Sequence, residues 1–469
     1  MELEKRGIPT ATVCTDEFFA LGKAEAEILG MPRLPIIHIP HPMAGQKPEH
    51  VAKVARGAVP EIIHILTANA AGLEEEYKNK VVTTKGRLRH KALFGDDFDS
   101  DRAPDKFKAP TSLEAINRLF YGRGWTDGLP VIPPTEERVR KMIDRWGFDP
   151  KEVVGLVDPR QGEASVAKIA VNAVMAGCIP EYLPVVIAAT RAMVQKDFLL
   201  YGLQTTTHLC TVMVLVNGPL AEELDINYGY NALGQGNMAN ATIGRAIRLI
   251  LTNIGGASPG VLDRATLGSP AKYTFCFAEN EAENPWEPLH VEKGFPKTVS
   301  TVTVFGVEGP HNVNDHGSNS AEEVLLTVSG VLATPGTNHI YLGGEPLIVL
   351  GPEHAQIIAS SGFSKADVKR FLYEKARVPM DLISKGNLER FQKIWPERFG
   401  GLESGDRVRI AEKPEDIIVV VAGGKGRHSA VIPTFGTTKA VTVPVTGSDG
   451  HPLVFEERKP GHGEPGARP

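Results

Sequence analysis

The chain has 469 residues, which is enough for roughly two or three domains of ordinary size. Its formal net charge of -5 leaves no basic stripe of the kind that binds nucleic acid, and no run approaches the ~18 apolar residues of a membrane span. The charged start and four widely spaced cysteines, without a Cys-x-x-Cys pair, indicate a cytoplasmic protein with neither a zinc ribbon nor a disulfide framework.

Residues 1–75 alternate between β-branched runs and amphipathic segments. Basic residues and Gly7 are typical of a helix end, strands are predicted at 8–14 and 34–39, and helices at 16–29 and 48–66. This is the order of a doubly wound βαβ domain that lacks its first strand and most of its first helix. We therefore expect a truncated α/β domain at the N-terminus.

The same segment, with its ELEKRGIPT, VCTDEF and PIIHIPHPMAG elements in order, resembles the UGSC-motif (seleno)protein family. That family is related to the substrate-binding B components of the selenol-dependent glycine and proline reductases. Its reactive selenocysteine or cysteine lies in a Sec/Cys-Gly-Ser-Cys motif after the first strand, and this motif is absent here. The resemblance, which covers residues 1 to about 70, implies that a thiol or selenol comes from a small partner subunit or from an upstream segment read through a selenocysteine codon.

Two residues of this region follow predicted strands. Cys14 precedes the start of a helix, whose amides can hold an anion and lower a thiol pKa; alternatively, it is a small buried residue beside a helix cap. His41 lies between two prolines, which either aim its imidazole into a site or form a rigid turn with a solvated histidine.

Residues 76–110 are charged without a sustained period and predict a solvated linker. A larger α/β domain is expected at 111–446, and a disordered tail rich in Gly and Pro at 447–469. In the loop after Gly124, Asp127 is a carboxylate in an otherwise apolar turn, so it is a candidate site residue or an acceptor of turn amides. Full-length fusions of the UGSC type carry a similar GWTDGLPV segment, which favours a functional role for this loop.

The large domain repeats one order of elements. A hydrophobic strand, a Gly-Pro turn, a polar loop and a capped helix begin near 212, 301 and 347, and we interpret this as a weak internal repeat, although such units recur in any α/β protein. The GxGxxA run at 234–239 has no strand before it and no GxxxxGK[ST] run occurs, so neither an NAD nor an ATP site is predicted. Asn237 and Asn240 of this loop are candidates to bind a substrate carboxylate.

The densest polar cluster follows the strand predicted at 301–305 and precedes a helix capped by Ser320. We expect this strand-to-helix loop at the carboxyl edge of the sheet, where ligands bind in α/β proteins. His316 beside Asp315 predicts an acid/base pair, or with His311 half of a divalent metal site. Asn312 and Asn314 are candidate substrate ligands.

A last glycine-rich turn follows the buried strand predicted at 417–422. Its Lys425, Arg427, His428 and Ser429 suit the anionic group of a substrate, or they are solvated residues of a surface hairpin.

The preferred function is a thiol- or selenol-dependent reductase-like enzyme, or a subunit of one. A small anionic substrate would bind between the glycine-rich loops and the carboxyl edge of the N-terminal domain, with His316 and Asp315 supplying protons. The alternatives are a metal-dependent lyase or hydratase, and a non-catalytic binding subunit. Because an incomplete sheet exposes an edge strand, a partner chain or a homo-oligomer is expected. The substrate, electron donor, cofactor and metal stay open.

Overall fold

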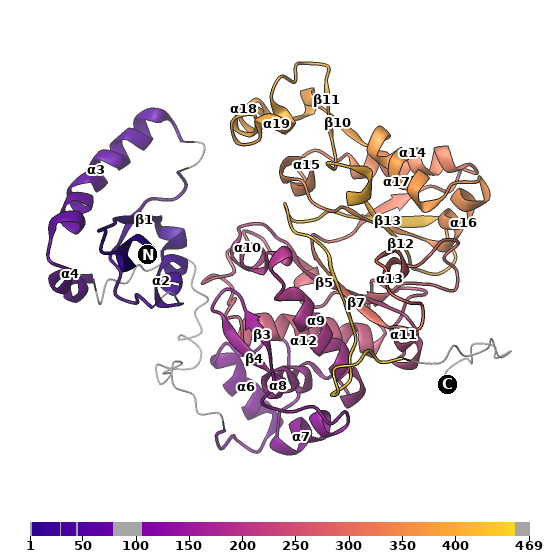
Figure 1. Cartoon of the computed structure of the whole chain (residues 1–469), viewed down its shortest axis with the longest axis horizontal. Helices are drawn as coiled ribbons and strands as arrows, with labels where there is room; N and C mark the ends of the chain where they lie inside the picture. Colours follow the sequence, from indigo (N-terminus) through magenta and orange to yellow (C-terminus); the bar gives the residue numbers. More distant parts are fainter. Residues whose placement is uncertain (1, 29, 44–45, 78–105, 455–469) are drawn as a thin grey trace.

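In the computed structural model, which describes residues 2–28, 30–43, 46–77 and 106–454, the N-terminal region forms a two-stranded parallel sheet flanked by helices (Figure 1). Its elements are α1 (Glu2–Lys5), β1 (Thr12–Thr15), η1 (Asp16–Phe18), α2 (Phe19–Ile28), β2 (Ile36–Ile39), α3 (Pro48–Thr67) and α4 (Ala70–Tyr77). The helical connection between the parallel strands β1 and β2 is the predicted βαβ order. Gly22 brings α2 against Cys14 on one face, and Ile65 of α3 packs on Ile37 on the other.

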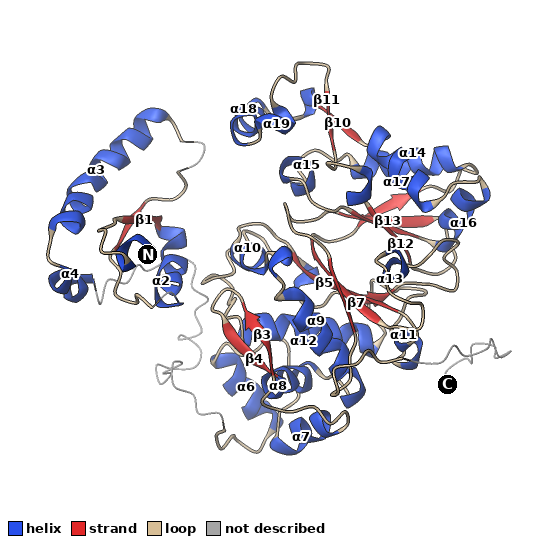
Figure 2. Cartoon of the chain, viewed as in Figure 1, coloured by secondary structure: helices blue, strands red, loops and turns tan. Residues whose placement is uncertain are grey.

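The large region places two four-stranded sheets face to face between two layers of helices (Figure 2). The first sheet, in the order β14-β7-β5-β6, consists of β5 (Thr211–Asn217), β6 (Cys276–Ala278), β7 (Thr301–Val307) and β14 (Val441–Pro444). The second, in the order β12-β9-β13-β8, consists of β8 (His311–Asn314), β9 (Leu347–Leu350), β12 (Ile418–Val421) and β13 (His428–Ile432). The predicted α/β class is confirmed.

Helices cover the outer face of each sheet. The first sheet packs against α8 (Val166–Ala176), α9 (Leu183–Met193) and α12 (Met238–Asn253), and the second against α14 (Ala321–Leu332), α16 (Pro352–Ser360) and α17 (Lys365–Lys375). Successive side chains of a strand point to opposite faces, so Val214 contacts the helices while Leu215 contacts the second sheet. In β9, Ile348 likewise contacts the helices, and Val349 contacts the first sheet. Because both faces are buried, these strands are apolar except for Thr211 and Asn217 at the two ends of β5.

The two sheets share one topology. In the first, β5 pairs in parallel with β6 and antiparallel with β7, which pairs antiparallel with β14. In the second, β9 pairs in parallel with β12 and antiparallel with β13, which pairs antiparallel with β8. β8, which follows β7 in the chain, therefore lies at the edge of the second sheet, and β14, which follows β13, lies at the edge of the first. The internal repeat is confirmed for the units that begin with β5 and β9, whereas the unit that begins with β7 is not equivalent to them.

The remaining elements lie around the sandwich. They are α6 (Leu113–Gly122), α7 (Glu136–Asp144), β3 (Val153–Val157), β4 (Gly162–Ser165), α10 (Leu200–Thr205), α11 (Leu220–Glu223), α13 (Leu289–Glu292), α15 (Asn338–Leu342), β10 (Arg377–Pro379), α18 (Lys385–Ile394), α19 (Pro396–Phe399) and β11 (Arg407–Arg409). No helix in the described part of the chain has the length and apolar character needed to cross a membrane. Most of the expected linker and residues 455–469 of the expected tail lie outside the described residues, while 447–454 form a turn in which the Leu453 amide donates to the Val445 carbonyl.

The N-terminal region contacts the large region through charged side chains of η1 and α2. Glu17 forms an ion pair with Arg264, and Glu25 forms a hydrogen bond with Tyr201 of α10. Figure 1 shows β1 and α2 on one side of the molecule and β12 and β13 on the other. The carboxyl edge of the N-terminal sheet and the glycine-rich turn at 423–429 are therefore apart and do not form one cleft in this chain.

Candidate functional site

The densest group of predicted site residues lies at one edge of the second sheet. β8 and β9 run in the same direction, since both are antiparallel to β13. Asn314 at the end of β8 and Gly351 directly after β9 therefore lie at the edge where His428 begins β13. This is the carboxyl edge of β8 and β9, the kind of position where α/β sheets bind ligands. The polar residues reach it through the short strand β8, which the sequence had suggested to be part of a loop.

Two imidazoles meet at this edge. Nε2 of His316 lies 3.2 Å from Nε2 of His428, and the two rings are nearly perpendicular, with centroids 4.9 Å apart. Nδ1 of His428 lies 3.0 Å from Oδ1 of Asn312. A carboxamide oxygen only accepts, so His428 donates from Nδ1, and its Nε2 is the acceptor in the contact with His316. Both histidines are exposed to solvent.

Asp315 does not face His316. Its carboxylate accepts hydrogen bonds from the amides of Gly317 and Ser318 and from the hydroxyls of Ser318 and Thr327. Burial raises the pKa of Asp315, but the hydrogen bonds from Thr327 and Ser318 outweigh it and hold the pKa below its ordinary value. The carboxylate thus orders the loop, and the predicted His316–Asp315 pair is not the arrangement observed.

Arg427 also holds this loop. Its Nη1 donates to the carbonyl oxygens of His316 and Ser318, each at 3.0 Å, and its Nη2 donates to Oδ1 of Asn319 at 3.0 Å. These contacts occupy the donors that were expected to bind a substrate anion. Lys425, by contrast, is exposed and forms no ion pair within the described residues.

Ser429 lies behind the edge and is only 7 % exposed. Its Oγ accepts from the Gly351 amide at 3.0 Å and lies 2.8 Å from Nδ1 of His354, whose Nε2 lies 3.0 Å from the Asp315 carbonyl oxygen. Because the carbonyl requires a donor, His354 is protonated on Nε2 and accepts the Ser429 hydroxyl proton on Nδ1. This buried chain ties β13, β9 and the loop together, and it leaves Ser429 no access to a substrate. The sequence offered no sign of His354 beyond its place after the Gly-Pro turn.

Asp127 has a partner that the sequence did not identify. Arg245 of α12 donates to both carboxylate oxygens, at 2.7 and 2.9 Å, and the Asp127 side chain is 4 % exposed. Arg245 also donates to the Leu129 and Pro130 carbonyl oxygens. The carboxylate therefore fixes the 124–134 loop on α12, a structural role.

Asn237 and Asn240 are likewise engaged by the backbone. Oδ1 of Asn237 accepts from the Asn240 amide at 3.0 Å and caps α12, while its Nδ2 donates to the Asp225 carbonyl. The Asn240 carboxamide pairs with both backbone groups of Asn227, at 2.8 and 2.9 Å, and is buried. Neither side chain is free to bind a carboxylate.

A second polar group lies at the carboxyl edge of β1 and β2. Oγ1 of Thr15 lies 3.1 Å from Nδ1 of His41, and the His41 amide donates to Oδ1 of Asp16 at 2.9 Å. Cys14 packs against Gly22, and burial raises its thiol pKa. His41 and Thr15 thus meet as the predicted strand order requires, while Cys14 shows the features of a packed residue rather than an activated thiol.

The predicted metal pair His311 and His316 is not brought together. Alternation along β8 places His311 on the face opposite Asn312, and Nδ1 of His311 contacts the Asn312 carbonyl oxygen at 3.0 Å. Within the residues that the structure describes, no three His, Cys, Asp or Glu side chains are arranged to hold a metal ion.

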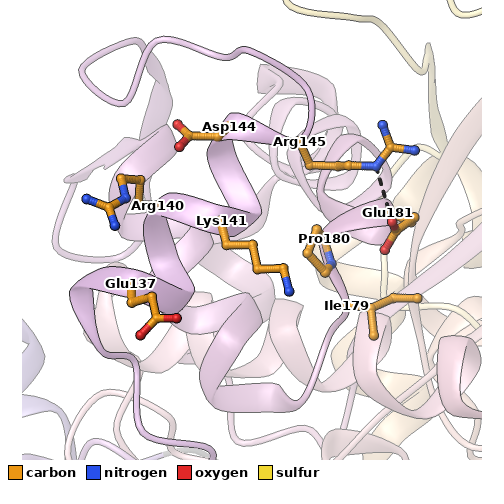
Figure 3. Close-up of a pocket in the computed structure, with 8 residues that line it drawn as sticks. All are labelled: Glu137, Arg140, Lys141, Asp144, Arg145, Ile179, Pro180 and Glu181. Atoms are coloured by element: carbon orange, nitrogen blue, oxygen red, sulfur yellow. Dashed lines mark hydrogen bonds and ion pairs between the residues drawn. The ribbon is translucent and has the colours of Figure 1, made fainter.

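Two surface clefts lie on the large region, and only the second is lined by a predicted site residue, Arg427. One lies beside α7 and is lined by Glu137, Arg140, Lys141, Asp144, Arg145, Ile179, Pro180 and Glu181. Figure 3 shows Arg145 reaching Glu181, at 3.2 Å, while the charged side chains of Arg140 and Asp144 extend on the other side of α7. No predicted site residue lines it. A second cleft borders the 316–319 loop at Asn319, Glu353 and Arg427.

A sequence model of the UGSC family matches residues 1–68. The match spans β1, α2, β2 and α3 and confirms the resemblance for the N-terminal region. A search of curated proteins found no match to the chain.

Proposed function

We propose, from the UGSC-family match over residues 1–68, that this chain is an enzyme, or the substrate-binding subunit of one, that acts by a thiol- or selenol-dependent reductive mechanism. The substrate is a small anionic molecule, and the reaction cleaves its carbon–heteroatom bond. The family match is the observation that carries the proposal.

The edge of β1 and β2 supports a reacting centre there. The Thr15 hydroxyl contacts the His41 imidazole, and the Asp16 carboxylate accepts from the His41 backbone amide, which places His41 beside the first turn of η1. An imidazole can transfer a proton to a leaving heteroatom at neutral pH. We assign this role to His41.

The state of the cysteines supports a reactive group carried by another segment or chain. Burial raises the pKa of Cys178 and Cys210 to about 12 and also raises the pKa of Cys14 and Cys276. The thiolate is the nucleophile, so thiols with raised pKa values react slowly near neutral pH. The Sec/Cys-Gly-Ser-Cys motif does not occur in the 469 residues.

In the proposed step, a thiolate or selenolate forms a bond to the substrate carbon as the carbon–heteroatom bond breaks. The heteroatom leaves with the bonding electron pair and takes a proton from His41. An external dithiol later reduces the carbon–sulfur or carbon–selenium bond of the adduct: the substrate carbon takes a hydrogen, the thiol or selenol is regenerated, and the dithiol is oxidised to a disulfide.

The test uses the natively produced protein together with any chain that co-purifies. Release of the heteroatom is measured with a panel of short carboxylic acids carrying amine, hydroxyl or halogen at the α-carbon, with and without dithiothreitol. We expect dithiol-dependent release that falls about 100-fold or more in His41→Gln. His38→Gln is the matched control, because His38 is an exposed histidine of β2, three residues before His41. Release that needs no thiol, or that is unaffected by His41→Gln, contradicts the proposal.

A further inference from the structure

We propose that His316 and His428 form a binding site for a divalent transition-metal ion of the zinc type, with Asn312 orienting His428. The site lies at the carboxyl edge of β8 and β9 and does not depend on the thiol chemistry proposed for the N-terminal region.

The spacing of the two nitrogens carries the inference. Two imidazole nitrogens bound about 2.0–2.1 Å from one tetrahedral zinc ion lie roughly 3.3 Å from each other. Nε2 of His316 and Nε2 of His428 are 3.2 Å apart. The two ring atoms are thus at the separation that one metal ion requires of two ligands.

The protonation of His428 suits a metal ligand. Its Nδ1 donates to Oδ1 of Asn312 at 3.0 Å, so the proton is on Nδ1 and the Nε2 lone pair faces His316. Metal binding then requires the Nε2 proton of His316 to be displaced, so that both Nε2 atoms are ligands. Metal-bound histidines in proteins almost always donate their second nitrogen to an oxygen in this way, which fixes both the tautomer and the ring orientation.

The backbone around both ligands is held before any ion binds. Arg427 donates to the carbonyl of His316, and the Asp315 carboxylate accepts from the amides of Gly317 and Ser318. His428 begins β13 opposite Asn314, whose side chain lies on the same face of the sheet. Little conformational freedom of the backbone is therefore lost on binding.

Two protein nitrogens leave coordination positions open for water or for an anionic ligand. Imidazole ligands favour zinc, copper and nickel over magnesium and calcium, which prefer oxygen. We therefore assign the site to a transition metal and expect weaker binding than at a closed four-ligand site.

The test is a zinc titration of the full-length, metal-free chain in competition with a chromophoric indicator. We expect one equivalent to bind above background, with at least 10-fold weaker binding in His316→Ala and in His428→Gln. Asn312→Ala keeps both ligands but loses the orienting acceptor, so about 10-fold weaker binding is expected.

His311→Ala is the matched control, because His311 is an exposed histidine of β8, the strand of Asn312, and its side chain points to the opposite face from that of Asn312. It should bind zinc as the wild type does. Co²⁺ provides a second readout, since its visible spectrum should show nitrogen ligands in the wild type and lose them in His428→Gln, with circular dichroism to verify folding. Equal affinity in the wild type and His428→Gln, or a loss in His311→Ala as large as that in His316→Ala, overturns the proposal and leaves a plain N–H···N hydrogen bond.

Discussion

Asp127 and Arg245 form a buried ion pair whose members are 118 positions apart in the chain. We predict that Asp127→Ala lowers the free energy of unfolding by about 3–5 kcal/mol, because it leaves a guanidinium buried without its counter-charge. Urea denaturation monitored by tryptophan fluorescence measures this. The exposed pair of Arg145 and Glu181 is the control, and Arg145→Ala should change the free energy by less than about 1 kcal/mol. Equal effects in the two variants would contradict the structural role of Asp127.

Glu279 at the end of β6 introduces a pH dependence. Burial raises its pKa from 4.5 to about 7 in the folded protein, although Lys365, the Leu289 amide and Asn217 lower it. Because the folded pKa exceeds the unfolded one, the folded state binds the proton more tightly. The stability associated with this group is fully present below about pH 4.5 and is lost as the pH rises through 7.

We therefore predict that the stability of Glu279→Gln increases relative to that of the wild type as the pH rises. The difference in unfolding free energy between the two proteins should shift by about 3 kcal/mol in favour of the variant from pH 4.5 to pH 8. Guanidinium denaturation at a series of pH values measures it. Only the difference is informative, because burial lowers the pKa of His339 to about 4, which removes stability as the pH falls from 6.5 to 4 and opposes Glu279. A pH-independent difference would contradict the prediction.

Among the elements, β8 and β13 position His316, which follows β8, and His428, which begins β13. Gly351 follows β9 at the same edge, and a Cβ at this position would lie 2.3 Å from the His428 carbonyl oxygen. The obstruction is backbone, so the strands must shift to accept a side chain.

We predict that Gly351→Ala destabilises the protein by about 1–3 kcal/mol and weakens zinc binding by displacing His428. Thermal unfolding and the indicator titration measure the two effects. Gly330→Ala is the control, since nothing lies within 4 Å of a Cβ there and it occupies the interior of α14; it should be neutral or stabilising by about 0.5–1 kcal/mol. Unchanged stability of Gly351→Ala would show that the edge is not tightly packed.

The strands and helices predicted with bounds lie within a few residues of the observed elements. The strand expected at 301–305 is β7, the helix expected at 48–66 is α3, and Ser320 caps α14 as expected. β8 was missed, because the residues His311 to Asn314 are polar and largely exposed and have no strand pattern of their own. They form a strand because β13 supplies the hydrogen bonds.

At the scale of the whole molecule, the described part of the N-terminal region contacts the large region through polar side chains. Arg264 pairs with Glu17, and Tyr201 bonds to Glu25. Interfaces of this kind are held weakly compared with apolar cores.

We predict that Arg264→Ala increases deuterium uptake in peptides from α2 and α10 without changing uptake in the sheets. Hydrogen exchange with mass spectrometry measures it. Arg33→Ala, which removes an ion pair with Glu74 inside the N-terminal region, should leave α10 unchanged. Identical uptake in α2 and α10 for Arg264→Ala and wild type would contradict the contact.

The sequence by itself determined the α/β class, the order of elements and the UGSC resemblance of residues 1–68, because periodicity, caps and local motifs depend on neighbouring residues. Only the tertiary structure decided which polar residues meet. His316 contacts His428, 112 positions away, and not His311, and Asp315 bonds its own loop. The exchange of edge strands between the two sheets brings β8 beside β13, and such long-range pairing is set by packing of the whole chain rather than by any local pattern.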